Sequence, residues 1–409
     1  MTSVLVVSEI FWPEGGGAER ATQLIVELLV RQGFDVSVVT GTRNPFRVPG
    51  VKYYITPYLR PSNRVTMWTL IRLLERNREF LNLLKKNEVL YIPLSAYPLI
   101  SLAKRNGLRV VVHVHNYMPV RYTGVKYYFE PDVVKSLEEA KLAVFHEFYV
   151  HKSLWRTLAF PASYLLYNLA KCWFAQADKI ICVSRRQAEL LVKSIPHVAG
   201  KVVIVYNPLP GEFLKKEPKN KLDDKPTFIY AGGGNLLKGF HMVLKALKSL
   251  SNEKIHARFI LTGNYSVQDV KLLKLLAHKY RNIEVQLKGR VRFEELMELY
   301  EQSWALLAPS IWEEPLPYVI FESLLSETLP IATKVGGIAE VLESIGGERF
   351  MIQPGDVAGL VSIIKGIVKS DLRDIVMTAK ELRRSLLDFY KFHEYTLRRK
   401  LLEIFSSQN

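Results

Sequence analysis

The chain alternates short β-branched runs with amphipathic helical stretches from its first residues, and the alternation restarts after a polar interruption. The run "SVLVVS" precedes "AERATQLIVELLVRQG", where apolar residues recur at helical spacing, and "DVSVVT" follows. A strand, a helix and a second strand in this order form a βαβ unit, whose strands pair in parallel. The pattern therefore predicts a parallel α/β sheet at the start of the chain.

More buried strands follow, on both sides of the interruption "YNPLPGEFLKKEPKNKLDDKPT", which places a hinge near residues 207–225. They are expected at "EVLYIP", "LRVVVHVH", "KIICVS" and "KVVIVYNP", and then at "FIYAGGG", "HARFILTGN", "IEVQLKG", "ALLAPS" and "LPIATKV". At 409 residues the chain is also long for one core. We predict two doubly wound, Rossmann-like α/β domains, residues 1–207 and 208–390, with a ligand cleft between their facing strand ends.

The chain has a net charge of +16, from 56 Lys and Arg against 40 Asp and Glu. This excess attracts polyanions, anionic lipid surfaces or phosphorylated substrates without choosing among them. Cys172 and Cys182 form no spaced disulfide or metal framework, so we expect a reducing, cytoplasmic setting. "MTSVLVVSEIF" reads as a first strand rather than a signal peptide, and we expect no transmembrane helix.

The first glycine run, in "SEIFWPEGGGAER", places Gly15, Gly16 and Gly17 just before a helix. Glycines there let a phosphate or sugar approach backbone N–H groups, assisted by the helix dipole. A dinucleotide fingerprint would be G-x-G-x-x-G with an acidic residue ending the second strand, which instead ends "VVTGTR". NAD is therefore disfavoured, and a flexible loop with incidental glycines is the alternative.

In "RVVVHVHNYMP", His113 and His115 stand two apart on a strand and so share one face. Such a pair could bind a metal ion, but no third ligand has suitable spacing. We favour one histidine at the ligand site, with a satisfied core histidine as the alternative.

The segment "YAGGGNLLKGFHMVLKAL" runs from a strand through a glycine loop to Lys238 and Gly239, which open a helix. A lysine beside loop amides suits a diphosphate, although the Walker A order G-x-x-x-x-G-K-[ST] is absent. The alternative is a solvated lysine.

The segment "SIWEEPLPYVIFESLLS" places two carboxylates around a helix start. We predict Pro317 at the first helical position, which leaves the N–H groups of Tyr318 and Val319 for a phosphate. Glu314 then precedes the helix and Glu322 lies a little over one turn into it. A carboxylate accepts hydrogen bonds from two neighbouring hydroxyls, as in a ribose or hexose. A glutamate on a solvated face is the alternative, but the surrounding helix is largely apolar.

Together these segments resemble the retaining, nucleotide-sugar-dependent glycosyltransferases of the GT-B fold, the "glycosyl transferases group 1" or family-four class. The most specific match is Glu314, seven intervening residues and Glu322, the E-x7-E signature. The matching segments, in chain order, are "PEGGGAER", "VHVHNYMP", "ADKIICVS", "VVIVYNP", "AGGGNLLKG", "LTGN", "LKGRV" and "PSIWEEPLPYVIFESLLSETLPIATKVGGIAEVL".

The resemblance implies catalytic roles for His115, Glu314 and Lys238. Lys238 would bind the diphosphate of a UDP-sugar or GDP-sugar, Glu322 the ribose, and Glu314 the transferred sugar. The other implied donor contacts are Gly16, Gly17, Gly233, Arg290, Leu316, Tyr318 and Val319. It also implies that no metal or other cofactor is needed, and that a final helix at about 391–409 crosses back to the first domain.

Three positions depart from the family pattern. Gly233 stands where an arginine is common, while Pro317 and Glu327 stand where glycine is usual. We therefore keep open a catalytically weak or inert sugar-nucleotide-binding subunit, alongside an epimerase or a phosphorylase of similar architecture. The E-x7-E segment favours transfer of a hexose.

The charge pattern of one segment suggests what kind of acceptor receives the sugar. Residues 43–86 carry ten Lys and Arg against Glu75 and Glu79, and "VTMWTLIRLLERNREFLNLLKK" has apolar residues at helical spacing. We hypothesise a peripheral contact with an anionic membrane, at its cytoplasmic face, that serves a lipid-linked or glycan acceptor. A core-packed helix with a solvated basic back is the alternative. The aromatic-rich stretch 145–174 is predicted to pack on the first sheet rather than to form an acceptor pocket, and no nucleic-acid partner is expected.

Overall fold

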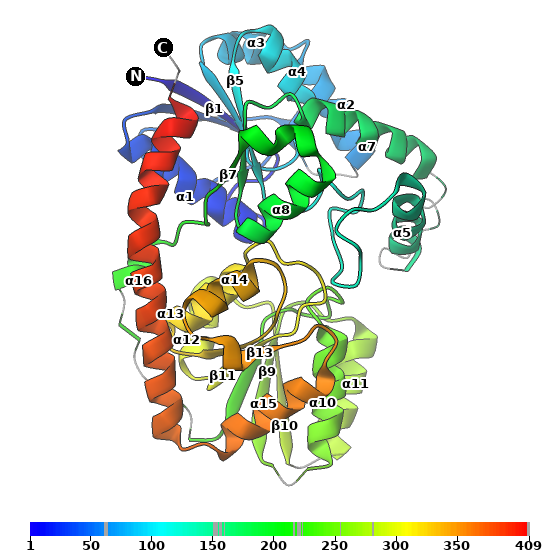
Figure 1. The fold of residues 1–409 in the computed structure, drawn as a ribbon, viewed down its shortest axis with the longest axis vertical. Coiled ribbons are helices and arrows are strands. Elements are labelled where there is room, and N and C mark those ends of the chain that lie inside the picture. Colours follow the sequence, from blue (N-terminus) through cyan, green and yellow to red (C-terminus); the bar gives the residue numbers. More distant parts are fainter. Residues whose placement is uncertain are drawn as a thin grey trace. The chain divides into compact units, whose positions relative to one another are not determined.

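The computed structural model describes residues 1–60, 64–149, 154, 158, 160–215, 217–218, 222, 224–253, 255–279 and 282–406 (Figure 1). The chain divides into two compact units. Unit 1 comprises Met1–Leu209 and His393–Asn409, and unit 2 comprises Pro210–Phe392. Part of the predicted hinge at 207–225 lies outside the described residues.

Unit 1 contains a seven-stranded sheet in the order β3-β2-β1-β4-β5-β6-β7, and every pair of neighbours is parallel. The strands are β1 (Ser3–Ser8), β2 (Asp35–Thr40), β3 (Lys52–Ile55), β4 (Val89–Ile92), β5 (Arg109–Val114), β6 (Lys179–Cys182) and β7 (Val202–Ile204). The six strands predicted for this half are confirmed. The sequence pattern missed β3, because this edge strand is largely exposed and lacks a buried apolar run.

The helices of unit 1 lie between its strands along the chain. They are α1 (Gly17–Arg31), α2 (Arg64–Leu74), α3 (Arg78–Lys85), α4 (Pro98–Arg105), α5 (Ser136–Tyr149), α7 (Phe160–Phe174) and α8 (Arg185–Ser194), with 3-10 turns η1 (Pro57–Leu59) and η2 (Pro196–Lys201). The predicted first helix is confirmed as α1, whose buried face carries Ile25 and Leu29.

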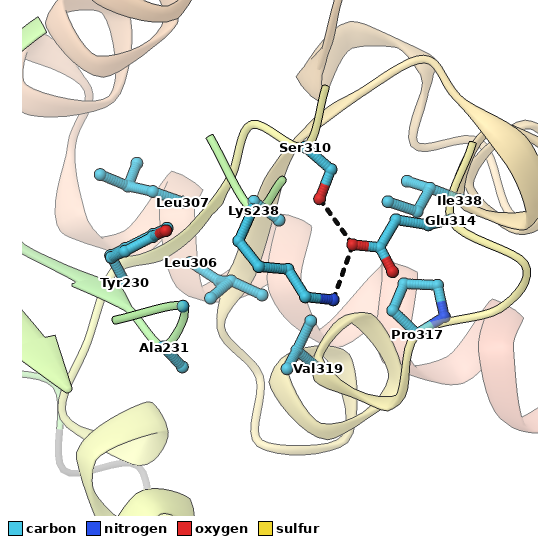
Figure 2. A pocket seen from close by; sticks show the side chains of 12 residues that line it. Tyr230, Ala231, Lys238, Leu306, Leu307, Ser310, Glu314, Pro317, Val319 and Ile338 are labelled. Carbon is cyan, nitrogen blue, oxygen red and sulfur yellow. Dashed lines mark hydrogen bonds and ion pairs between the residues drawn. The ribbon is translucent and has the colours of Figure 1, made fainter. Parts of the chain in front are cut away.

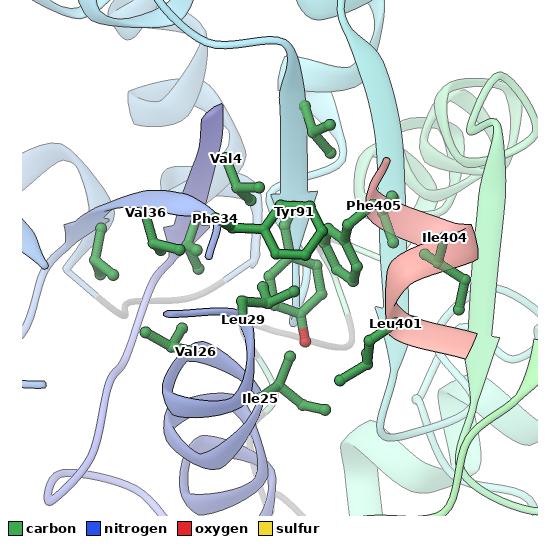
Figure 3. Packing of buried hydrophobic residues seen from close by; sticks show 14 of the residues in the cluster. Val4, Ile25, Val26, Leu29, Phe34, Val36, Tyr91, Leu401, Ile404 and Phe405 are labelled. Atoms are coloured by element: carbon green, nitrogen blue, oxygen red, sulfur yellow. The ribbon is translucent and has the colours of Figure 1, made fainter. Parts of the chain in front are cut away.

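The core of unit 1 lies between α1, the sheet and the last turns of the C-terminal helix (Figure 3). Ile25 and Leu29 meet Tyr91 of β4, and the Tyr91 ring packs edge-on against Phe405 with centroids 5.2 Å apart. Ile404 belongs to the same cluster. The end of the chain is therefore part of the first core, because its apolar residues complete it.

Unit 2 contains a six-stranded parallel sheet in the order β10-β9-β8-β11-β12-β13. Its strands are β8 (Thr227–Tyr230), β9 (Ala257–Thr262), β10 (Ile283–Gly289), β11 (Ala305–Ala308), β12 (Leu329–Thr333) and β13 (Met351–Ile352). The five predicted strands are confirmed, and the two-residue β13 is too short to leave a pattern. Two parallel α/β sheets of the doubly wound kind confirm the predicted fold class.

The helices of unit 2 end in one long helix. They are α9 (Gly211–Lys215), α10 (Phe240–Ser251), α11 (Val267–Lys279), α12 (Phe293–Glu301), α13 (Tyr318–Leu325), α14 (Gly336–Ser344), α15 (Val357–Lys369) and α16 (Leu372–Phe405), with the 3-10 turn η3 (Glu348–Phe350). The final helix was predicted from about residue 391, but α16 is 34 residues long and contributes residues to both units. None of the described helices combines the length and apolar character of a membrane span.

The basic segment forms two helices rather than one. Asn77 separates α2 from α3, and its Oδ1 accepts a hydrogen bond from Phe80 N at 2.9 Å. Apolar residues such as Trp68 and Ile71 are buried, whereas Arg72 and its neighbours on the basic side are exposed. The interpretation as core-packed helices with a solvated basic back therefore describes this segment in the structure.

Candidate functional site

The strand order of unit 2 reverses between β8 and β11, which is where open α/β sheets bind ligands at their carboxyl ends. A pocket of about 30 Å³ lies there, enough for about one water molecule. It is lined by Tyr230, Ala231, Gly232, Lys238, Leu306, Leu307, Ala308, Ser310, Glu314, Pro317, Val319 and Ile338 (Figure 2). The second sheet thus brings the predicted lysine and glutamate to one point.

Lys238 and Glu314 form an ion pair at the centre of this pocket (Figure 2). Lys238 Nζ lies 2.7 Å from Glu314 Oε1, and Ser310 Oγ donates a hydrogen bond of 2.8 Å to the same oxygen. The Glu314 side chain is only 5% exposed, against 36% for Lys238. A buried carboxylate needs such partners, and a diphosphate or a sugar would compete with them for either charge.

Two glycines allow the loops that carry Lys238 and Glu314 to pack against neighbouring backbone. Gly239 has φ 78°, and a Cβ there would stand 1.8 Å from the carbonyl oxygen of Pro309. Gly336 has φ 50°, and its Cβ would stand 2.0 Å from the carbonyl oxygen of Glu314. Gly337 N donates to that same Glu314 oxygen at 2.8 Å. The backbone of Glu314 is therefore fixed by the start of α14.

Glu313 was not singled out by the sequence pattern, although it anchors the same loop. Its Oε2 accepts a hydrogen bond of 2.7 Å from Gly336 N, and the residue is buried. The paired glutamates of "WEEP" were the available signal, because two adjacent carboxylates before an apolar helix need two separate partners.

The position predicted for Pro317 is wrong by one residue. With ψ 133°, Pro317 is extended and is the N-cap, and α13 begins at Tyr318. Val319 lines the pocket, whereas the buried Leu316 and Tyr318 do not. Glu322 is half-buried on α13, outside the pocket lining, where its charge adds to the effect of burial in raising the pKa of Tyr300.

The departures from the family pattern have local explanations. Gly233 has φ 58°, and a Cβ there would stand 2.7 Å from the carbonyl oxygen of Asn264, so an arginine does not fit this loop. Glu327 follows α13 with φ 57°, a left-handed conformation that suits glycine better. Burial raises the pKa of the Glu327 carboxyl, although the charges of Lys380 and Arg383 lower it.

Arg290, a predicted donor contact, is exposed just after β10.

The first sheet has an equivalent reversal between β1 and β4, and a buried carboxylate lies there. Glu9 follows β1 and is 2% exposed, and Ser95 donates to its Oε1 from N at 3.1 Å and from Oγ at 2.8 Å. Burial, with a small contribution from the charge of Glu19, raises the pKa of Glu9 to about 7. The sequence pattern missed this group, although an acidic residue directly after a buried strand is a signal.

Glu9→Gln is expected to stabilise the protein above pH 7 by up to about 3 kcal/mol and to have little effect below pH 4.5. The pKa of Glu9 is about 7 in the folded chain against a reference value of 4.5. Between these values the folded state holds a proton that the unfolded state releases, so the free energy of unfolding falls as pH rises. Glutamine keeps an oxygen for Ser95 and removes this slope. Urea unfolding across this pH range measures it, with exposed Glu88→Gln as control, and an equal difference at every pH would contradict it.

The two histidines lie at the end of β5 with ring centroids 4.0 Å apart, as the prediction of a shared face requires. His113 is fully buried and its Nδ1 lies 2.7 Å from the hydroxyl of Tyr91, so it is a core histidine, although its Nε2 has no hydrogen-bond partner in the described part of the chain. Part of the His115 residue is exposed but its ring nitrogen Nε2 is buried, and this burial lowers the pKa of the imidazole to about 3, which keeps it neutral. Its Nε2 has no hydrogen-bond partner among the described residues. Within those residues, no three His, Cys, Asp or Glu side chains are grouped to hold a metal.

A side chain of the following helix accepts a hydrogen bond from the first glycine run. Gly16 precedes α1, and its N–H donates to Glu19 Oε2 at 2.6 Å. A Cβ at Gly15 would stand 2.4 Å from Glu19 Cδ, so this glycine leaves room for the carboxylate. The Gly16 amide that we predicted for a ligand is occupied by Glu19, and a phosphate reaching Gly16 or Gly17 has to displace that carboxylate.

Comparison with known proteins covers both halves of the chain. The profile of the family described as Glycosyltransferase Family 4 matches residues 15–212, and that of Glycosyl transferases group 1 matches residues 212–384. The phosphatidylinositol N-acetylglucosaminyltransferase gpi3 subunit of Schizosaccharomyces pombe is 23% identical over 177 residues, which are 43% of this chain and 38% of that protein. The putative glycosyltransferase YtcC of Bacillus subtilis is 22% identical over 204 residues, 44% of this chain and 50% of YtcC. The chain thus spans half or less of these two relatives.

A longer match is a phosphatidylinositol N-acetylglucosaminyltransferase component from Arabidopsis thaliana, 22% identical over 344 residues, 83% of this chain and 69% of that protein. Among solved structures, Anabaena HepE in complex with UDP-glucose superposes with a TM-score of 0.67, 16% identity and full coverage of both chains. Sucrose-phosphate synthase from Thermosynechococcus elongatus gives a TM-score of 0.71 at 15% identity, covering 98% of this chain and 100% of that one. With both family profiles matched and both parallel sheets present, the chain belongs to the GT-B glycosyltransferases of the group 1 and Family 4 class.

Proposed function

We propose that the protein is a retaining hexosyltransferase that moves a hexose from a UDP-sugar to an acceptor hydroxyl without a metal ion. The observation that carries the proposal is the Lys238–Glu314 ion pair at the strand-order reversal of the second sheet. It offers a cation for phosphate and a carboxylate for sugar hydroxyls at one place. The uridine donor is supported by the likeness to HepE, which was crystallised with UDP-glucose.

In this mechanism the bond between the anomeric carbon and the diphosphate oxygen breaks. A bond from that carbon to the acceptor oxygen forms on the same face, and the acceptor proton passes to the leaving diphosphate. Lys238 neutralises the charge that develops on the diphosphate, and Glu314 accepts hydrogen bonds from the sugar. His115, neutral because of its burial, exchanges hydrogen bonds rather than charge with the substrate.

The remaining donor contacts are proposed from the resemblance. Glu322 takes the ribose hydroxyls and Arg290, exposed after β10, lies beside the base. Amides around Leu316, Tyr318 and Val319 hold the phosphates. Gly16, Gly17 and Gly233 contribute close backbone approach.

The acceptor is proposed to be a lipid-linked glycan or glycolipid. Two relatives are named as components of phosphatidylinositol N-acetylglucosaminyltransferases, whose name implies a lipid substrate. The exposed basic side of α2 and α3 supports a peripheral contact with an anionic membrane, at its cytoplasmic face.

A thermal-shift screen against UDP, GDP, ADP and their hexose conjugates tests the donor site. A uridine ligand at 100 times its Kd is expected to add about 2.7 kcal/mol, which raises Tm by roughly 5 °C. Lys238→Ala and Glu322→Ala are expected to diminish the shift. Lys334→Ala, in an exposed pair with Glu343, is the control. No shift with any nucleotide would overturn the proposal, and binding without transfer or hydrolysis would favour the inert sugar-nucleotide-binding protein.

A further inference from the structure

Helix α5 buries two glutamates and exposes most of its large apolar residues, the reverse of an ordinary surface helix. Its buried face consists of Glu139, Ala143 and Glu147, spaced four residues apart. The residues on its outer side are large and apolar: Leu137, Val144, Phe145 and Phe148 are all exposed. An exposed apolar face of this kind marks a contact surface, because its removal from water is favourable.

The buried charge of Glu139 is stabilised by a polar interface with α7. Its Oε1 accepts hydrogen bonds from Tyr122 N at 2.9 Å and from the Tyr167 hydroxyl at 3.0 Å. Its Oε2 accepts from the Tyr164 hydroxyl at 3.3 Å and from Lys171 Nζ at 3.4 Å. Four donors satisfy the carboxylate, so the polar face of α5 is committed to the inside of the unit.

Helix α7 presents an apolar stripe of the same kind. Leu165 and Leu169, one turn apart, are 67% and 47% exposed, while Tyr167, Ala170 and Phe174 are buried on the other side. The stretch 145–174 was predicted to pack on the first sheet; residues 150–153, 155–157 and 159 lie outside the described part of the chain, and α7 packs against α4 and α2. On the outer side of α7, Leu165 and Leu169 remain exposed to solvent.

A largely cationic border adjoins these two helices on the side of α2 and along α5. Lys135 and Lys141 are exposed on or beside α5, together with one acidic residue, Glu138. Helix α2 adjoins α7, because the guanidinium of Arg72 lies 5.7 Å from the ring centroid of Trp173. The basic side chains exposed on or next to α2 and α3 are Arg72, Arg76, Arg78, Lys85 and Lys86. They outnumber the acidic residues there, which are Glu75, paired with Arg72 at 3.2 Å, and the exposed Glu79. Apolar stripes bordered by lysine and arginine are complementary to an anionic bilayer.

We propose that α5 and α7 form the surface by which this protein docks on an anionic lipid bilayer, with Leu165 and Leu169 among the acyl chains and Arg76 and Arg78 at the headgroups. The inference rests on the membrane contact proposed above and names the element that inserts. It places insertion on α5 and α7 rather than on α2 and α3, whose apolar faces are already used by the core. A second copy of the chain is the less favourable occupant, because two cationic borders would repel each other.

Co-sedimentation with vesicles of equal parts phosphatidylcholine and phosphatidylglycerol tests the surface. The double variant Leu165→Ser, Leu169→Ser is expected to bind at least about tenfold more weakly, because two leucines no longer leave water. The matched control is Leu275→Ser, Leu272→Ser on α11 of unit 2, whose leucines are similarly exposed at 68% and 43%. The control is expected to bind like the unchanged protein, and all variants are expected to keep their circular dichroism.

Several results would overturn the inference. The unchanged protein could fail to sediment with these vesicles, or the α7 variant could sediment equally well. Loss of binding only on Arg76→Gln and Arg78→Gln would assign the contact to charge alone. A dimer in light scattering that becomes monomeric in the α7 variant would assign the face to a second copy. The UDP-glucose thermal shift is measured separately on every variant, so failure of the donor site is distinguishable from failure of the membrane surface.

Discussion

Glu314→Gln is expected to lower the rate of sugar transfer by at least about a hundredfold while leaving unit 2 folded. Glutamine is isosteric, and its oxygen still accepts hydrogen bonds from Ser310 and Lys238, which lie 2.8 Å and 2.7 Å from the native carboxylate. The negative charge is lost, however, so hydrogen bonds to the transferred sugar weaken. Release of UDP from the donor identified by thermal shift, in the presence and absence of acceptor, measures kcat and KM.

The direction of the two kinetic constants makes this prediction specific. Removing the charge of Glu314 releases Lys238 from its ion pair, so the donor diphosphate meets a stronger cation and KM should not rise. The control is Glu343→Gln, which removes an exposed carboxylate paired with Lys334. A Glu314→Gln enzyme with unchanged kcat would contradict the proposed role, and a rise in KM alone would reassign Glu314 to ground-state binding.

The sequence predicted the strands that are buried on both sides, because burial alone determines their residue pattern. Strands buried on both sides, such as β1 and β11, leave continuous apolar runs, and each was predicted. The exposed edge strand β3 and the two-residue β13 leave none. The start of α13 was misplaced by one residue, because Pro317 suits either an N-cap or a first turn and only its ψ angle decides.

The candidate site was predicted in its residues more than in its contacts. Spacing pointed to Lys238 and Glu314 separately, but they are 76 positions apart, and only the strand order brings them together. Glu9, Glu19 and Glu313 were missed, since acidic residues beside glycines or strands are common and sequence alone does not reveal which ones are buried. The same holds for Glu139 of α5, a buried glutamate that the sequence analysis did not single out.

Gly239→Ala is expected to destabilise unit 2 by about 3 kcal/mol or more and to remove donor binding. The glycine is the N-cap of α10, directly after Lys238, and has φ 78°. A Cβ there would stand 1.8 Å from the carbonyl oxygen of Pro309, a backbone atom that no rotamer change can move. Because Pro309 begins the loop that carries Ser310 and Glu314, relief of the clash separates the two halves of the pocket. Urea unfolding gives the loss of stability, and hydrogen exchange at β8 and β11 locates it.

Gly346→Ala separates the clash from the backbone conformation itself. Gly346 has φ 79°, nearly the same as Gly239, and lies in the same unit, but a Cβ there would meet nothing within 4 Å. Gly346→Ala is therefore expected to lower the free energy of unfolding only by what a left-handed alanine costs, about 1 kcal/mol. The difference between the two variants measures how tightly the Lys238 loop is packed against the Pro309 loop. Equal destabilisation, with donor binding retained in both, would mean that the loops yield easily and that the ion pair does not depend on their close approach.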